Sequence, residues 1–207
     1  MTTKKHFILF ALSITTLMFN ACGRQSTQQA KSPTYDIGVV INGVRWATSN
    51  VDAPGTFAKN PEDAGMLFQW NRRKGWCATN ETEGWDESTP TGTAWYAEND
   101  PCPQGWRVPS ADELRSLHDS GHEWVSNWDD TDINGRVFGT YPNQIFLPAA
   151  GSRITDGTLN AVDAGGGYWS STQFNSTRAI NLWFSNISSG VSDLRRVYGF
   201  SVRCVAE

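Results

Sequence analysis

The sequence of 207 residues lacks the short motifs that indicate several common chemistries. It has no Cys-x-x-Cys pair, no Gly-x-Ser-x-Gly elbow and no glycine-rich phosphate loop, so zinc or thioredoxin-type sites, α/β-hydrolases and P-loop proteins have no support. It has three histidines and no internal repeat. No nucleophile stands beside a candidate base, and we therefore expect a protein that is not an enzyme.

The chain also lacks an apolar run long enough to span a bilayer. Its longest such run, residues 7–19, follows Lys4 and Lys5 and is typical of a signal peptide. It leads to Ala21 and Cys22, and a small residue before cysteine is the pattern of bacterial lipoproteins. We predict a signal peptide over 1–21 and lipidation of Cys22, with an ordinary signal peptide as the alternative.

The remaining chain divides into a tether and one domain. Residues 22–34 are rich in Gln, Ser and Thr without periodicity, which favours a flexible tether. Residues 35–207 are long enough for one domain with a substantial core. We therefore expect a lipoprotein of the bacterial outer membrane, facing the periplasm or the cell surface, with the lipid as its only membrane contact.

Positive charge is scarce. The formal net charge is −4, and residues 1–21 contain two lysines and no acid, so the mature chain is more acidic still. An acidic surface argues against nucleic acid as a partner. Aromatic residues make up 12% of the chain and ten of them are tryptophans. Most should be buried, and a surplus ring can line a binding site.

Local signals predict one helix and many short strands, hence an α+β domain. Asn42-Gly43 between two apolar runs predicts a hairpin. Ser110 and Glu113 form a capping-box pattern that begins a helix over about 110–120, ended by Gly121. We expect a helical turn over 61–64, a loop over 71–101 pinned by its tryptophans, and a hinge or tight passage at 165–167. Short strands are expected over 39–41, 44–47, 66–70, 137–138, 145–147, 168–169, 180–184, 196–198 and 200–205.

Once Cys22 is set aside for lipid, three cysteines remain. An exported chain meets an oxidising compartment, so one pair and one leftover thiol are expected. Joining Cys102 to Cys204 would tie the last strand to the start of the main helix. Cys77, in a polar loop, is the cysteine that we expect to remain unpaired.

Seven segments, in this order along the chain, resemble the Fibrobacter succinogenes major paralogous domain family over about residues 38–206. The resemblance implies a C-type lectin-like fold, which is similar to that of formylglycine-generating enzymes, with short antiparallel strands, one main helix and long loops. It also implies that Cys102–Cys204 is the only disulfide within the domain and that Cys77 is unpaired. The C-terminal region resembles retroelement-diversified variable proteins. The segments are 46–48, 69–72, 99–109, 135–139, 146–151, 168–171 and 199–204.

The C-terminal region also holds the predicted binding surface. Alternation along 180–184 places Ile180, Leu182 and Phe184 on one side of a strand and Trp183 on the other. We predict recognition through about 173–195, with Trp183 and Phe174 as anchors; the alternative is that a loop covers Trp183. The predicted contact residues are Gln173, Phe174, Asn175, Arg178, Asn181, Trp183, Ser185, Asn186, Asp193 and Arg195.

Metal sites have weak candidates. Asp130, Asp132 and Asn134 match the start of a calcium loop, but Tyr141 replaces the glutamate at the twelfth position, which favours an acidic turn. The lectin triplets Glu-Pro-Asn and Gln-Pro-Asp are absent. His118 and His122 have the spacing of a helical metal pair, yet Gly121 between them favours a solvated helix end. We expect no cofactor, with calcium as the weak alternative.

These observations predict an exported, lipid-anchored module that binds a protein or glycan. One alternative is a structural or tip subunit of a surface filament. A less favoured one is an enzyme of the formylglycine-generating type, which needs a reactive cysteine pair, whereas Cys102 and Cys204 resemble a structural pair.

Overall fold

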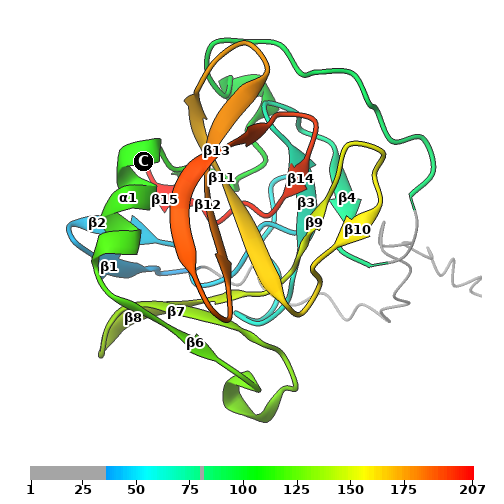
Figure 1. The fold of residues 1–207 in the computed structure, drawn as a ribbon. Coiled ribbons are helices and arrows are strands. Elements are labelled where there is room, and N and C mark those ends of the chain that lie inside the picture. Colours follow the sequence, from blue (N-terminus) through cyan, green and yellow to red (C-terminus); the bar gives the residue numbers. More distant parts are fainter. Residues whose placement is uncertain (1–35, 80–81) are drawn as a thin grey trace, which may run out of the picture.

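The computed structural model describes residues 36–79 and 82–207 (Figure 1). The predicted signal peptide, the lipidation of Cys22 and the tether over 22–34 lie outside these residues. Within them, the fold consists mainly of antiparallel β-sheets with one short α-helix, which confirms the α+β class. No helix in this part of the chain has the length and apolar character needed to cross a membrane.

Four sheets are formed by the described strands. Their orders are β1-β2-β15-β5, β10-β9-β14-β3-β4, β11-β12-β13 and β6-β7-β8. Two single 3-10 turns, Ala97–Asn99 and Trp128–Asp130, lie in the loops. The strands are β1 Val39–Ile41, β2 Val44–Trp46, β3 Met66–Gln69, β4 Gly75–Cys77, β5 Trp106–Arg107, β6 His122–Val125, β7 Gly135–Thr140, β8 Asn143–Pro148, β9 Ser152–Arg153, β10 Leu159–Asn160, β11 Gly165–Gln173, β12 Arg178–Ser185, β13 Ser189–Arg195, β14 Gly199–Phe200 and β15 Val205–Ala206.

The strongest local signals are confirmed. Asn42 and Gly43 adopt positive φ values of 49° and 81° and close the β1–β2 hairpin. Helix α1, Ala111–Asp119, begins with the full capping box: Glu113 N donates to Ser110 Oγ, and Ser110 N donates to the Glu113 carboxylate. The helix ends at Asp119, with Ser120 as its C-cap and Gly121 following.

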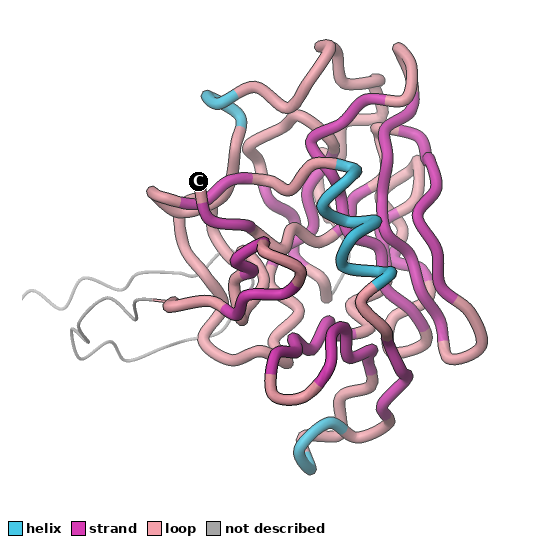
Figure 2. Tube along the Cα trace, turned by 90° about the vertical axis from the view of Figure 1, so that its left-hand side faces the viewer, coloured by secondary structure: helices cyan, strands magenta, loops and turns pink. Residues whose placement is uncertain are grey.

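The β11–β12–β13 sheet lies between two hydrophobic clusters. Trp169 and Ala179 belong to one cluster, and Tyr168 and Leu182 belong to the other. Helix α1 packs along the second face of this sheet, beside the long strands (Figure 2). The central strands are therefore covered on both faces.

The glycines at 165–167 are not a hinge. They are the first three residues of β11, and all three are buried. A Cβ at Gly167 would lie 2.6 Å from the Phe200 ring, and one at Gly166 would lie 2.7 Å from the Phe184 ring. Glycine lets aromatic rings pack directly against the strand backbone here.

Three predicted elements differ from the structure. Pro61 and Glu62 form a turn rather than a helical turn. Residues 196–198 are also a turn, and the strand expected over 200–205 is divided between β14 and β15. The cause at 196 is tertiary: the Arg196 guanidinium lies 4.1 Å from the centre of the Trp70 ring and donates to the Gly92 carbonyl.

The segment 71–101 contains β4, which the sequence did not predict. The rest of the segment is held in place by contacts of its tryptophan side chains. Trp85 Nε1 donates to Thr155 O at 2.9 Å, and Trp95 Nε1 donates to Asn99 O at 2.9 Å. Trp76 packs against Trp85 with ring centroids 5.0 Å apart. Trp85 thus holds the segment against the body of the domain, and Trp95 packs against Trp70 with ring centroids 6.1 Å apart, as expected.

The Cys102–Cys204 disulfide is present. It joins the loop before β5 to the chain just before β15, so it ties together neighbouring parts of one sheet. The prediction of a free thiol at Cys77 is wrong, because that residue is also disulfide-bonded. The surplus thiol expected at Cys77 is therefore not found among the described residues.

Candidate functional site

The expected alternation along β12 is observed at its apolar positions. Ile180, Leu182 and Phe184 are 8%, 0% and 2% exposed, whereas Trp183 is 38% exposed. All ten tryptophans lie in the described residues, and Trp183 alone falls in the exposed class. No loop therefore covers it fully.

Asn181 does not lie on the surface as predicted. It is 1% exposed, and its side-chain nitrogen is 3.4 Å from Ser192 O on β13. The prediction assumed that one face of the strand meets solvent. In the structure that face is covered near Asn181, because its neighbours Trp169 and Ala179 belong to a hydrophobic cluster.

The predicted contact residues do not gather on one surface. One group lies around the β11–β12 turn and the other around the β12–β13 turn, at opposite ends of the long strands (Figure 1). The eight residues of β12 span about 25 Å at the usual rise per residue. The first group is Gln173, Phe174, Asn175, Arg178, Asp193 and Arg195; the second is Trp183, Ser185 and Asn186.

The first group mainly holds its own turn together. Asn175 Oδ1 accepts from the backbone nitrogens of Thr177 and Arg178, both at 2.9 Å. Arg178 forms an ion pair with Asp193, and Arg196 donates to Gln173 Oε1 at 3.0 Å. These polar groups are already satisfied within the domain. Phe174, which is 58% exposed, remains available at this end.

The second group presents an open indole. The cross-strand partners of Trp183 are Gly167 and Gly190. A Cβ at Gly190 would lie 3.5 Å from Trp183 Nε1, so the ring leans over that glycine. Within residues 36–79 and 82–207, this indole nitrogen makes no hydrogen bond. We call Trp183, Asn186 and the 87% exposed Ile187 the Trp183 patch.

At the same end of β12 and β13, on the Ser189 side, lies a hydrogen-bonded cluster that the sequence did not predict. His118 from α1 and His122 from β6 have ring centroids 4.6 Å apart. Ser189 Oγ lies 3.2 Å from His118 Nε2 and 3.1 Å from His122 Nε2. Arg136 contacts His122 Nδ1 at 2.8 Å and donates to Ser185 O at 2.7 Å. Four separate strands and α1 meet here, so spacing alone could not show it.

The charge of Arg136 sets the direction of this network. A guanidinium can only donate, so His122 Nδ1 accepts and neutral His122 carries its proton on Nε2, facing Ser189. The Ser189 hydroxyl can then donate to His118. Burial, His118 and Arg136 together lower the pKa of His122. The cluster is therefore built around a neutral His122.

This arrangement predicts a pH-dependent loss of stability. Because the folded pKa of His122 lies below 6.5, the unfolded chain takes up its proton first. The contribution is fully present above about pH 6.5 and is lost as the pH falls toward the folded pKa. We expect His122→Gln to weaken the stability difference between pH 7.5 and pH 5.5, measured by urea unfolding. An identical pH dependence in both proteins would contradict this role.

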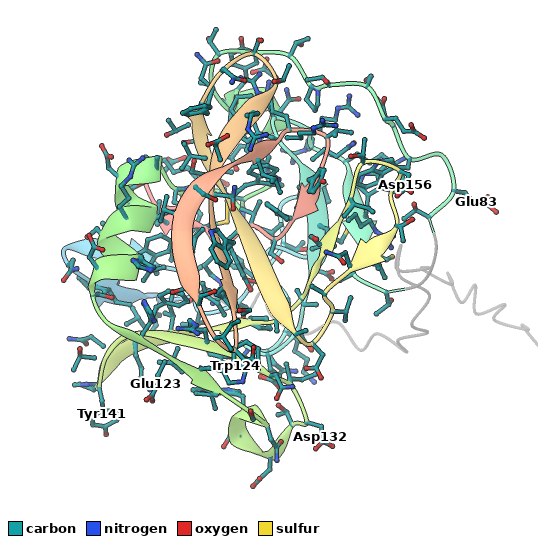
Figure 3. The ribbon with its side chains drawn as sticks, viewed as in Figure 1. Glu83, Glu123, Trp124, Asp132, Tyr141 and Asp156 are labelled. Atoms are coloured by element: carbon teal, nitrogen blue, oxygen red, sulfur yellow. A yellow bond between two sulfur atoms is a disulfide. The ribbon has the colours of Figure 1, made fainter. Side chains whose placement is uncertain are left out.

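The calcium candidates lie in a tight loop at the periphery, where Asp132 projects away from the body of the domain (Figure 3). Asn134 Oδ1 accepts from Asn127 N at 3.1 Å, so this oxygen serves the turn. Asp130 and Asp132 both have positive φ. Residues 36–79 and 82–207 contain no group of three or more His, Cys, Asp or Glu side chains placed to hold a metal ion.

A cavity of about 420 Å³ lies on a different part of the domain, between the β3–β4 turn and the loop around residues 84–99. A second cavity, of about 430 Å³, lies beside the Cys102–Cys204 bridge. The first is lined by Gln69, Asn71, Arg72, Arg73, Lys74, Trp76, Gly84, Asp86 and Asn99. Comparison with family models, curated proteins and solved structures yields no match to this chain.

Proposed function

We propose that this chain is an exported, lipid-anchored binding module with a C-type lectin-like fold, related to the Fibrobacter succinogenes major paralogous domain family. Support comes from the ordered segments over about residues 38–206 and from the signal-peptide and Ala21-Cys22 pattern. The mixture of short antiparallel strands, one helix and long loops agrees with that proposal. The lipid on Cys22 would hold the domain at the outer membrane.

The observation that carries the binding role is the exposure of Trp183. It stands on a strand whose neighbouring residues, Leu182 and Phe184, are buried. Glycine stands opposite it on both neighbouring strands. A flat apolar ring with a free N–H can stack on a sugar face or an apolar side chain and also donate one hydrogen bond. A glycan or protein partner fits this chemistry.

The test is a glycan and surface-protein binding screen on residues 35–207, followed by two alanine variants. Trp183→Ala should weaken the affinity for the partner by about 2 kcal/mol or more, as expected for an aromatic anchor. Its free energy of unfolding should fall by only about 1 kcal/mol, because the ring is partly exposed. A buried ring would cost about 3–5 kcal/mol.

Phe174→Ala is the matched control, since Phe174 is an exposed aromatic at the opposite end of the same strands. It should leave the affinity unchanged. A partner whose binding depends on Phe174 and not on Trp183 would move the site to the other turn and refute the assignment.

The structural alternative, a filament or tip subunit, is favoured by one feature. Strand β13 is an edge of its sheet, and edge strands offer unpaired backbone groups to a neighbouring chain. Sedimentation of the purified chain separates the two functions: concentration-dependent growth of long oligomers would favour the subunit, and a monomer that binds a ligand would favour the module.

A further inference from the structure

The cavity between the β3–β4 turn and the loop around residues 84–99 has an unusual charge for this protein. Three cations and one carboxylate line it, although the chain as a whole carries −4. Arg72 pairs with Asp86 at 2.5 Å and also donates to Ser88. Arg73 and Lys74 are exposed, and neither is ion-paired with a carboxylate of the described residues.

A buried donor without a partner belongs to the same lining. Trp76 on β4 is 6% exposed, and its Nε1 has no hydrogen-bond partner. Most buried donors in proteins are satisfied, and an unpaired one costs stability. The Lys74 ammonium lies 3.8 Å from the centre of the Trp76 ring, so a positive charge is held beside this indole.

The other polar groups of the lining are largely committed to the fold. The Gln69 amide nitrogen donates to the carbonyls of Asp86 and Val197. Asn71 Oδ1 accepts from Tyr96 N, and Asn71 Nδ2 donates to Thr91 O. The groups left to recognise a ligand are therefore mainly the Lys74 ammonium and the Arg73 guanidinium, which also donates to Asp100 O.

The second cavity provides a contrast. Its lining contains Arg73 and Arg107 but also the carboxylates of Asp100 and Glu207. Arg107 is further neutralised by Glu113, at 2.7 Å. Its charges balance, whereas the first cavity also contains Lys74, which has no ion-pair partner among the described residues; Arg73 lines both cavities. Of the two cavities, only the first has the excess of positive charge that favours binding of an anion.

We propose that the first cavity binds an acidic monosaccharide, that is, a sugar carrying a carboxylate or a phosphate. Its anionic group would lie against Arg73 and Lys74, beside the Trp76 ring that also lines the cavity. A cavity of about 420 Å³ lies at the small end of ligand sites, which suits one sugar ring. This site is separate from the Trp183 patch and does not depend on the function proposed for it.

The test uses glucuronate and glucose 6-phosphate as probes, with glucose as the neutral control and inorganic phosphate as the bare anion. Indole ¹H–¹⁵N signals of the soluble chain are followed by NMR, and Trp76→Phe identifies the Trp76 signal. We expect at least one sugar acid to shift that signal, while glucose does not. The variant Arg73→Gln/Lys74→Gln should bind about tenfold more weakly, because charge-assisted contacts are lost.

Lys59→Gln is the matched control, since Lys59 is exposed and lies outside the cavity. It should leave the affinity unchanged, as should Trp183→Ala. Thermal melts of each variant show whether the fold is retained. The proposal is overturned if neither sugar acid moves the Trp76 signal, if glucose or bare phosphate binds equally well, or if Lys59→Gln weakens binding as much as the double variant.

Discussion

Replacing Arg203 by methionine lowers the free energy of unfolding by about 3 kcal/mol, because several buried neutral oxygens lose their hydrogen-bond donor. Arg203 is 1% exposed. Its Nε and Nη2 donate to Asn50 Oδ1 at 3.0 and 2.8 Å, and its Nη1 donates to Thr48 O at 2.5 Å and Ala47 O at 3.2 Å. Methionine fills similar space but leaves these oxygens without their donor.

The guanidinium remains charged at neutral pH, although burial lowers the pKa of Arg203 to about 10. Urea unfolding at pH 7 measures the effect. Arg45→Met is the control, because Arg45 is exposed and makes one hydrogen bond, to Ile37 O; it should cost less than about 0.5 kcal/mol. Equal losses in the two variants would show that the buried network does not stabilise the fold.

Removing the Cys102–Cys204 bridge is the second large effect. The two cysteines are 102 residues apart in sequence, and a native disulfide of this kind contributes about 2–5 kcal/mol. Cys102 and Cys204 are 9% and 0% exposed, within a hydrophobic cluster. The bridge joins the segments that supply β5 and β15, so its loss removes a covalent link between the edge strand β5 and the neighbouring C-terminal strand.

The Cys102→Ala/Cys204→Ala double variant isolates this bond, whereas a reducing agent would also affect Cys77, which is disulfide-bonded. The free energy of unfolding, measured by urea titration, should fall by about 2–5 kcal/mol. Non-reducing peptide mapping of the wild type should recover the Cys102–Cys204 peptide and identify what Cys22 and Cys77 carry. If the double variant is as stable as the wild type, the Cys102–Cys204 bridge does not contribute to the stability of the fold.

Features with a local cause could be predicted from the sequence. The Asn42-Gly43 turn needs positive φ at adjacent positions, and the capping box at Ser110 and Glu113 satisfies backbone donors within one turn. The buried side of β12 also followed from its alternation. For the disulfide, the resemblance to a family narrowed the choice among three cysteines to one pair.

The candidate site was only partly predictable. Alternation correctly placed Trp183 on the open side of its strand, but it could not show that the same face is covered at Asn181 by a hydrophobic cluster. Nor could it show that the predicted contacts divide between two distant turns. Which part of a strand face meets solvent depends on what packs against it, and the strand itself does not contain that information.

The sequence by itself determined the turns, the helix cap, the buried stripe of β12 and the absence of familiar catalytic motifs, because each depends on neighbours along the chain. Tertiary structure alone decided the turn at Arg196, the meeting of His118, His122, Arg136 and Ser189, and the positively charged cavity beside Trp76. These depend on contacts between residues far apart in sequence. A buried guanidinium or indole takes its partners from whichever backbone lies nearby, and only the packed chain determines which one that is.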